Sequence, residues 1–250
     1  MGIHTPQKVV VIMPAYNAAC TLEKTYQDIP HDIVERVILV DDNSSDTTVE
    51  IAKRLKLDVI EHEKNLGYGG NQKTCYQHAL EHKPDIVIMI HPDYQYDATK
   101  IPDMIEPIAN GECDIVFGSR ILNHGALQGG MPLYKYVANR FLTFMENRAL
   151  GLQLSEYHTG LRAYSSKVLR SLHLALNSDD FVFDTEITVQ AVALGYRIHE
   201  IPVETRYFPE ASSINFKRSV EYGVSTMITL LKYLLHRSGI SPSMQFDRKS

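Results

Sequence analysis

Residues 86–97, with the sequence Ile-Val-Ile-Met-Ile-His-Pro-Asp-Tyr-Gln-Tyr-Asp, decide the fold, because five consecutive apolar residues run directly into a polar cluster. A short run rich in isoleucine and valine, bounded by turn-forming residues, is typical of a central parallel strand that is buried on both faces. Ligands in open α/β sheets bind outside the carboxyl ends of such strands. We therefore expect Asp93 and Gln95 to lie where a substrate binds, while the same residues also fit a turn that only ends the strand.

Similar short runs alternate with helical patterns along the first half of the chain. This alternation predicts an α/β fold with a doubly wound, mainly parallel sheet, right-handed crossovers and helices on both faces. A last strand is expected at 198–203, where Pro202 favours a place near a sheet edge or strand end. The earlier strand-like runs occupy residues 8–13, 37–40, 59–60, 86–90 and 115–117.

The second half of the chain is richer in helical patterns. Residues 123–130 contain glycines and are expected to form a loop, a candidate lid over the substrate. Gly151 marks the end of the helix that follows this loop, because glycine readily adopts the left-handed conformation that closes a helix. Apolar residues recur at helical spacing in four segments, at 133–150, 166–176, 184–194 and 216–237.

The last of these predicted helices is amphipathic. Val220, Val224 and Ile228 lie on one of its faces, and basic residues lie elsewhere. Such a helix can lie on a membrane surface, pack on a partner subunit or cover the protein's own sheet. Because the sequence has no internal repeat and no low-complexity linker, we predict one compact domain at 1–215, followed by a C-terminal amphipathic helix and tail at 216–250.

Composition limits the classes of function. The formal net charge of −5 gives no reason to expect a nucleic-acid partner. The three cysteines form no closely spaced pair, so neither a zinc site nor a disulfide framework is expected. The N-terminus lacks the apolar core of a signal peptide, and no run of about eighteen apolar residues occurs. We therefore expect a cytoplasmic protein without a membrane-spanning helix.

Four loops follow predicted strand ends and should meet along one edge of the sheet. They offer carboxylates, amides, an aromatic ring and flexible backbone, at residues 14–17, 41–44, 65–70 and 91–97. A nucleoside diphosphate needs this set, because amides and carboxylates bind base and ribose, a ring stacks on the base, and a divalent metal held by oxygens neutralises the diphosphate. The glycines match neither the G-x-G-x-x-G dinucleotide fingerprint nor the P-loop.

Six segments together carry a resemblance to a known family. They are Val-Val-Ile-Met-Pro-Ala-Tyr-Asn at 10–17, Val-Asp-Asp-Asn-Ser-Ser-Asp at 40–46, Asn-Leu-Gly-Tyr-Gly-Gly at 65–70, Pro-Asp-Tyr-Gln at 92–95, Phe-Gly-Ser-Arg at 117–120 and Thr-Gly-Leu-Arg at 159–162. With these segments the chain resembles family 2 glycosyltransferases of the GT-A fold over roughly residues 8–215. It is most similar to polyprenyl-phosphate (dolichyl-phosphate) hexosyltransferases. The resemblance implies a Rossmann-like GT-A domain at 1–215.

The resemblance also implies which residues bind the nucleotide sugar. Asp42 would bind the nucleoside together with the loop after the first strand, and Asp41 would support the turn. Arg206, with Ser212 and Ser213, resembles a late basic-and-serine loop of the family. The full set implied for nucleotide-sugar binding is Pro14, Ala15, Tyr16, Asn17, Asp41, Asp42, Gly67, Gly70, His91, Asp93 and Arg206.

A divalent metal is part of the same expectation. Asp93 occupies the last acidic position of the family's D-x-D motif, so with Gln95 it would bind Mg²⁺ or Mn²⁺ on the diphosphate. The chain departs from the family at His91, where the first aspartate usually stands. Imidazole suits Mn²⁺ better than Mg²⁺, so Mn²⁺ is favoured if His91 is a ligand, and strict metal dependence is left open. His78 and His82 also have a metal-binding spacing, but without a carboxylate motif we interpret them as a solvated helix face.

We expect a single displacement at the anomeric carbon, with Asp93, Arg120 and Glu156 as the catalytic residues. Arg120 would meet phosphate near the acceptor side, where positive charge stabilises the leaving diphosphate. An acceptor phosphate is already an anionic nucleophile and needs no protein base. An acceptor hydroxyl would need one, and Glu156, Asp184 or Glu186 could serve. For Asp184, helix capping is the favoured interpretation.

The expected function is therefore inverting transfer of a sugar from a UDP- or GDP-hexose to a polyprenyl phosphate, at the inner face of a membrane. One alternative is transfer to a hydroxyl of a soluble saccharide or protein in envelope polysaccharide assembly. Another, prompted by His91, is a catalytically silent nucleotide-binding scaffold. The terminal helix would make a peripheral membrane contact, and its apolar face leaves a homo-oligomer open.

Overall fold

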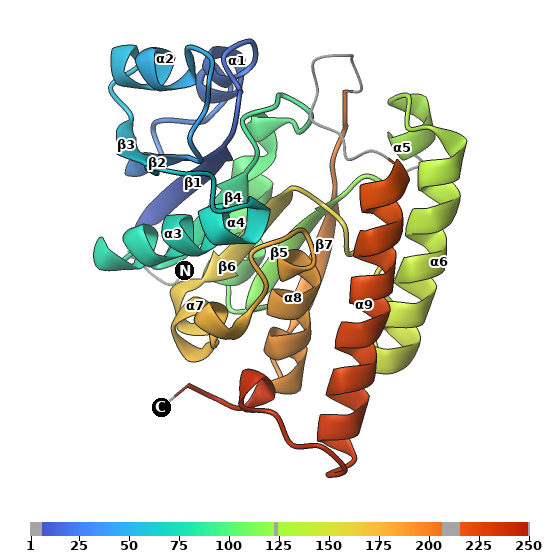
Figure 1. Cartoon of the computed structure of the whole chain (residues 1–250). Helices are drawn as coiled ribbons and strands as arrows, with labels where there is room; N and C mark the ends of the chain where they lie inside the picture. Colours follow the sequence, from blue (N-terminus) through green and yellow to red (C-terminus); the bar gives the residue numbers. More distant parts are fainter. Residues whose placement is uncertain (1–6, 123–124, 207–215, 250) are drawn as a thin grey trace.

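A computed structural model describes residues 7–122, 125–206 and 216–249. These residues form a seven-stranded sheet in the order β3-β2-β1-β4-β6-β5-β7, with helices on both of its faces (Figure 1). The strands are β1 Val9–Ala15, β2 Arg36–Asp41, β3 Asp58–Glu61, β4 Ile86–Ile90, β5 Ile115–Ser119, β6 Leu161–Ser165 and β7 Ile198–Pro202. The helices are α1 Leu22–Gln27, α2 Thr48–Arg54, α3 Tyr68–Glu81, α4 Ile101–Ala109, α5 Gly125–Gln128, α6 Leu133–Leu150, α7 Ser166–Ser171, α8 Phe183–Ala193 and α9 Phe216–Arg237.

The sheet is mainly parallel, which confirms the predicted fold class. β1 pairs in parallel with β2 and β4, and β5 pairs in parallel with the edge strand β7, where Pro202 ends the strand. β6 is the exception, because it lies antiparallel between β4 and β5. No strand is predicted from the sequence at Leu161–Ser165, because its Leu-Arg-Ala-Tyr-Ser sequence lacks the apolar run of the other strands. It contains a fully buried arginine, Arg162.

Two apolar layers hold the sheet between its helices. Alternate residues of β1 enter opposite layers, as the two-residue period of a strand requires. Val9 and Val11 pack in the layer that includes side chains of α1, α2 and α4, while Val10 and Ile12 pack in the layer of α3, α7 and α8. All five residues of β4 are buried, so this strand is central, as predicted.

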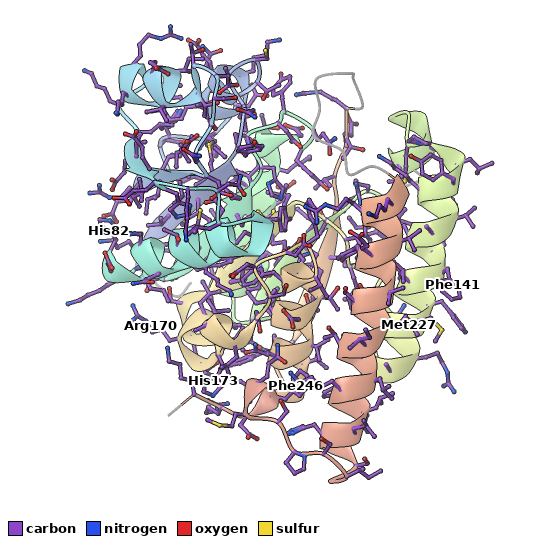
Figure 2. All side chains as sticks on the ribbon, viewed as in Figure 1. His82, Phe141, Arg170, His173, Met227 and Phe246 are labelled. Atoms are coloured by element: carbon purple, nitrogen blue, oxygen red, sulfur yellow. The ribbon has the colours of Figure 1, made fainter. Side chains whose placement is uncertain are left out.

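Helices α6 and α9 run side by side at one end of the sheet and begin at the same end (Figure 1). Both have the predicted bounds, and Gly151 closes α6 at φ 72°. α9 packs on the rest of the chain through Leu230 and Tyr233, which join a third apolar cluster with Leu150 of α6 and Val189 of α8. Figure 2 labels Phe141 on α6 and Met227 on α9. The division of the chain at residue 215 stays a prediction.

Two local expectations differ from the structure. The predicted helix at 166–176 is shorter, because α7 ends at Ser171 and a 3₁₀ turn follows at Leu174–Leu176. The expected loop at 123–130 contains the short helix α5, and residues 123–124 lie outside the described residues. No helix in the described part of the chain is long and apolar enough to cross a membrane.

Candidate functional site

A cavity of about 1720 Å³ opens at the carboxyl ends of β1, β2 and β4 and continues between α6 and α9. It brings Asp42 and Asp93 into one cleft, as the convergence of the strand ends predicts. Among the residues predicted for the site, Asp41, Gly70, Glu156 and Arg206 do not line the cavity. Those that do are Pro14, Ala15, Tyr16, Asn17, Asp42, Gly67, His91, Asp93, Gln95 and Arg120.

The acidic turn after β2 organises the backbone of the cleft. Asp41 accepts hydrogen bonds from the Ser44 N–H at 2.8 Å and from the Ser44 hydroxyl at 2.5 Å, which closes the turn. Asp42 accepts from the N–H groups of Leu66 and Gly67 at 2.8 and 3.0 Å. Its other close partner is His62, at 2.8 Å. Because both Asp42 oxygens already have partners, this carboxylate fixes the glycine loop beside the cleft.

Glycine is needed in this loop for packing. Gly67 has φ 87°, and a Cβ there would lie 2.6 Å from the carbonyl oxygen of Asp179. A Cβ on Gly70 would lie 2.9 Å from Cβ of Leu66. Side chains at these two positions would therefore displace the loop. The two glycines let α3 start close to residues 178–179.

Tyr16 and Asn17 form the mouth of the cleft beside the acidic turn. Asn17 adopts φ 50°, and its side-chain oxygen accepts a hydrogen bond from the Ser45 N–H at 2.9 Å. Tyr16 is 58% exposed, so its ring is accessible to a flat ligand. This arrangement suits stacking of a nucleobase on the ring.

Asp93 follows β4 and lines the cavity. Its carboxylate accepts a hydrogen bond from the Gln95 N–H at 3.0 Å. Burial raises the pKa of Asp93, while the nearby His91 and Arg120 act in the opposite direction. A partly buried carboxylate that is costly to keep charged is stabilised by a bound cation, so Asp93, Gln95 and the His91 ring fit a divalent metal.

Arg206 lies outside the cavity, against the loop that carries Asp93. Its guanidinium carbon is 4.3 Å from the centre of the Tyr94 ring, and its N–H donates to the Gln95 carbonyl at 3.0 Å. It therefore supports the Asp93 loop from outside the cavity. The predicted partners Ser212 and Ser213 lie outside the described residues.

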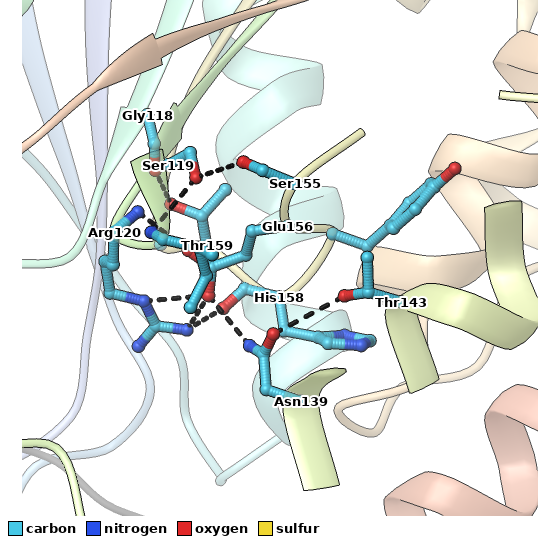
Figure 3. Close-up of polar contacts among 12 residues, drawn as sticks. Gly118, Ser119, Arg120, Asn139, Thr143, Ser155, Glu156, His158 and Thr159 are labelled. Atoms are coloured by element: carbon cyan, nitrogen blue, oxygen red, sulfur yellow. Dashed lines mark hydrogen bonds and ion pairs between the residues drawn. The ribbon is translucent and has the colours of Figure 1, made fainter. Parts of the chain in front are cut away.

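Arg120, just beyond β5, is held by a buried carboxylate (Figure 3). Glu156 is fully buried and accepts hydrogen bonds from the Arg120 N–H at 2.8 Å, from Nε at 2.9 Å and from Nη2. Asn139 of α6 also donates to it, at 2.8 Å. Since Glu156 is enclosed and accepts all these bonds, its geometry suits orienting the guanidinium and not accepting a substrate proton, the base role considered from the sequence.

The loop that carries Glu156 is fixed in turn. Glu200 of β7 accepts hydrogen bonds from the N–H groups of Ser155 and Glu156, at 2.6 and 2.9 Å. The hydroxyls of Ser119 and Ser155 are 2.6 Å apart, and Thr159 donates to a β5 carbonyl at 2.5 Å (Figure 3). These bonds hold Arg120 rigidly at the cleft, which is the preorganisation that stabilising a charged leaving group requires.

A buried network that is not predicted from the sequence joins α3, β6 and α8. Asp184 accepts hydrogen bonds from Tyr68 at 2.8 Å and Gln72 at 3.0 Å, and pairs with the fully buried Arg162 at 3.3 Å. Tyr68 in turn lies 2.9 Å from His91. Asp184 therefore anchors the wall and does not simply cap a helix. The available signal was the spacing of Tyr68 and Gln72, which share one face of α3.

The far part of the cavity is apolar and lies between α6 and α9. Lys135 and Arg218, in the first turns of these helices, line the same cavity as Arg120. Burial and the charge of Arg120 lower the pKa of Lys135. The apolar walls are formed by Met131, Leu142, Met145, Ala149, Gly223, Val224, Met227, Ile228, Leu230, Leu231 and Leu234.

Among the described residues, no group of three or more His, Cys, Asp or Glu side chains could hold a metal ion. His78 and His82 fit the predicted solvated face, because they pair with Glu81 at 3.3 Å and Asp58 at 3.6 Å (Figure 2 labels His82). A metal at Asp93 would therefore take most of its ligands from a bound diphosphate.

Three comparisons relate the chain to known proteins. The model of glycosyl transferase family 2 matches residues 10–172. A UDP-N-acetylglucosamine–dolichyl-phosphate N-acetylglucosaminyltransferase of Methanococcus voltae is 30% identical over 216 residues, which cover 80% of this chain and 86% of that protein. An uncharacterized protein of Methanocaldococcus jannaschii is 30% identical over 200 residues, covering 80% and 82% of the two chains.

Solved structures share the fold. Glucosyl-3-phosphoglycerate synthase of Mycobacterium tuberculosis, in complex with phosphoglyceric acid, aligns with a TM-score of 0.68 and 19% sequence identity. The alignment covers 98% of this chain and 86% of that chain. The architecture described above is thus that of GT-A proteins.

Proposed function

This chain belongs to glycosyl transferase family 2 and is a glycosyltransferase, and we propose that it transfers a hexose from a UDP- or GDP-sugar to a polyprenyl phosphate with inversion. The main observation behind the proposal is a single cavity that is polar at one end and apolar at the other. Its polar end holds Asp93 and Arg120, and its far end is an apolar groove between α6 and α9. A phosphate with an isoprenoid tail matches a polar end that is followed by an apolar groove.

The donor would occupy the polar end. The exposed ring of Tyr16 would stack on the base, and the backbone fixed by Asp42 would border the ribose. Asp93 and Gln95 would hold a divalent cation, Mg²⁺ or Mn²⁺, against the diphosphate. When bound, this cation supplies positive charge to the leaving group.

The reaction would be a single displacement. An oxygen of the acceptor phosphate forms a bond to the anomeric carbon while the bond from that carbon to the diphosphate oxygen breaks, so the configuration inverts. Arg120, oriented by Glu156, would stabilise the negative charge that builds on the diphosphate. Because the acceptor phosphate is already anionic, no protein base is required, which agrees with the enclosed position of Glu156.

Three observations support a phosphate-bearing lipid acceptor. Lys135 and Arg218 line the cavity with Arg120, and both lie in the first turns of long helices, where the helix dipole favours anions. The groove beyond them is walled by aliphatic and aromatic side chains, which favour an apolar tail. The M. voltae relative is named for transfer to dolichyl phosphate.

The acceptor class is tested with purified enzyme and labelled nucleotide sugars. UDP- and GDP-hexoses are each incubated with polyprenyl phosphate, with the matching polyprenol and with soluble saccharides, and the product is identified by mass spectrometry. We expect a sugar phosphodiester of the lipid with inverted anomeric configuration. Turnover only with soluble hydroxyl acceptors would refute the lipid acceptor and support the alternative role in polysaccharide assembly.

Filling the groove should discriminate between acceptors by tail length. A Cβ on Gly223 would lie 3.8 Å from Leu142, an ordinary contact, so the Gly223→Leu side chain would extend into the space between α9 and α6. Leucine favours a helix over glycine by about 1 kcal/mol, so folding is preserved. We expect the KM for dolichyl phosphate to rise about tenfold or more, the order of a lost hydrophobic contact.

Geranyl phosphate is the matched control for this variant, because its short tail ends near the phosphate. Its kcat/KM should stay within about twofold of wild type, since the catalytic end is unchanged. Equal losses for both acceptors would show that the substitution disturbs the active site, and unchanged kinetics for both would place the tail elsewhere.

The exposed apolar residues of α6 and α9, some of which also line the groove, would rest on the membrane that holds the acceptor. Val137, Phe141 and Phe144 of α6 are 59–60% exposed, and Val224 and Ile228 of α9 are 55% and 61% exposed. Bulky apolar side chains gathered at this density on a surface are typical of an interaction face. We propose a peripheral contact at the inner face of a membrane through these two helices.

Liposome sedimentation measures this contact. Phe141→Ser with Phe144→Ser should lower the partition of the enzyme onto phospholipid vesicles about tenfold or more, because each buried phenylalanine contributes about 1.5–3 kcal/mol. Leu176→Ser is the control, as Leu176 is also exposed, at 51%, but lies on a 3₁₀ turn away from these helices. Equal binding of all three proteins would contradict the proposed face.

A further inference from the structure

His158 lies in the same loop as Glu156, and its backbone holds Arg120. The His158 carbonyl accepts a hydrogen bond from Arg120 Nη2 (Figure 3). The residue also lines the cavity, although its side chain is only 12% exposed. The ring of His158 is thus an enclosed polar group beside the cleft, and the proposed sugar transfer gives it no role.

Glu146 of α6 approaches one nitrogen of this ring. Its Oε2 lies 3.1 Å from His158 Nε2, and its side chain is 1% exposed. Neither carboxylate oxygen of Glu146 forms a hydrogen bond of standard geometry with the described residues. Because a carboxylate buried without polar partners is costly, this contact keeps the ring beside α6.

Tyr222 of α9 contacts the other ring nitrogen. Its hydroxyl lies 2.6 Å from His158 Nδ1, and the two rings pack edge to face with their centres 5.3 Å apart. The same hydroxyl lies 3.2 Å from the hydroxyl of Thr185 on α8. Burial and the charge of Glu146 raise the pKa of Tyr222, so its hydroxyl keeps a proton to donate.

The two contacts restrain His158 from two different helices. The ring and the carbonyl belong to one residue, so a ring fixed at both nitrogens also limits where the carbonyl can move. Glu156 restrains the Arg120 guanidinium independently, by accepting a hydrogen bond from Nε at 2.9 Å. Asn139 of α6 donates to Glu156 at 2.8 Å. Arg120 is therefore held by two residues that are each bonded to a helix of the acceptor groove.

We propose that His158 is a positioning residue: its ring, held between Glu146 and Tyr222, fixes the carbonyl that keeps Arg120 directed at the leaving diphosphate. The inference rests on the proposed function, because it takes the role of Arg120 from that reaction. His158 acts through Arg120 and not on the reacting atoms. A displacement of about 1 Å at a catalytic group can cost about 10²-fold in rate, so a restraint of this kind contributes to kcat.

Tyr222→Phe removes one hydroxyl and tests this restraint by steady-state kinetics. With dolichyl phosphate and with geranyl phosphate alike, we expect kcat to fall about tenfold, less than after loss of Arg120 itself, because Glu156 still orients the guanidinium. The KM values for the nucleotide sugar and for both acceptors should stay within about twofold of wild type. A residue that only lined the groove would instead raise the KM for the long acceptor alone.

Substitutions of His158 separate the two contacts of its ring. Asparagine places its amide near the position of Nδ1 and glutamine near that of Nε2, so each can keep one of the two contacts. We expect kcat of His158→Asn and of His158→Gln to lie between those of wild type and His158→Ala. Tyr233→Phe is the matched control and should keep wild-type kcat, because Tyr233 is buried on the same helix, packs on Phe246 and does not line the cavity.

An acceptor-free measurement is ¹⁵N NMR of the Arg120 Nε–H group, which is assigned by its absence in Arg120→Lys. Because Nε donates to the buried Glu156, we expect one slowly exchanging signal in wild type. In Tyr222→Phe and His158→Ala this signal should shift and exchange faster with solvent. In Tyr233→Phe it should match wild type.

Wild-type kcat in a folded Tyr222→Phe variant, or a change confined to the KM for dolichyl phosphate, would overturn the inference. An Arg120 signal that is the same in wild type and in Tyr222→Phe would overturn it as well. Tyr222→Phe, which loses a single hydroxyl, decides both readouts if His158→Ala does not fold. Failure of sugar transfer to any polyprenyl phosphate would refute the proposed acceptor, while the Arg120 signal would still show whether His158 positions Arg120.

Discussion

Replacing Asp93 by asparagine is expected to lower kcat for sugar transfer about 10³-fold. Asparagine keeps the size of the side chain and can still accept the hydrogen bond from Gln95, but it removes the negative charge that would hold the cation on the diphosphate. Cation stabilisation of a leaving group contributes several kcal/mol, and about 4 kcal/mol corresponds to a factor of about 10³ in rate. Steady-state kinetics with saturating donor and acceptor measure the change.

Asp97→Asn is the control for this variant. Asp97 lies in the same loop, but its carboxylate bonds Thr99 at the start of a 3₁₀ turn and does not line the cavity. Its activity should stay near that of wild type. An Asp93→Asn enzyme with wild-type kcat would show that the carboxylate has no part in the reaction.

Replacing Arg120 by alanine is expected to lower kcat/KM about 10²- to 10³-fold, the usual loss when one donor that stabilises developing charge is removed. The variant also leaves Glu156 buried without its main partner, which costs stability. The double variant Arg120→Met with Glu156→Gln separates the two effects, because it removes both charges. We expect it to regain much of the lost stability and none of the lost activity.

Arg197→Ala serves as the matched arginine. Arg197 is exposed and pairs with Asp114 at 3.4 Å, at the opposite end of β5 from Arg120. Its replacement should change neither kcat/KM nor stability appreciably, since exposed ion pairs contribute about 0–1 kcal/mol. If Arg120→Ala and Arg197→Ala behaved alike, the assignment of Arg120 to the leaving group would be wrong.

The elements with a clear periodicity could be predicted from the sequence. The apolar run of β4 and the helical spacing of α6 and α9 gave bounds that the structure reproduces. β6 was not predicted, because Arg162 at its second position disguises a buried strand. Nothing local predicts a buried arginine, whose stability depends on Asp184, far along the chain.

The candidate site, too, could be predicted only in part from the sequence. Parallel strands place their following loops at one edge, so the meeting of Asp42 and Asp93 followed from topology. The function of each carboxylate could not be predicted from topology, because it depends on partners that folding brings together. Asp42 is engaged by the glycine loop and Glu156 by Arg120. Lys135 was not predicted as a site residue, because it lies in a helix whose apolar spacing indicates packing against the rest of the chain.

Calorimetric titration of the enzyme with a nucleoside diphosphate sugar in the presence of Mn²⁺ tests the proposed donor site most directly. We expect one binding site per chain for either the uridine or the guanosine donor, with affinity strongly reduced by chelation of the metal and in Asp93→Asn. Donor binding that is equally tight in wild type and in a folded double variant of Asp93→Asn and Arg120→Ala would contradict it, because the donor would then bind outside this cleft.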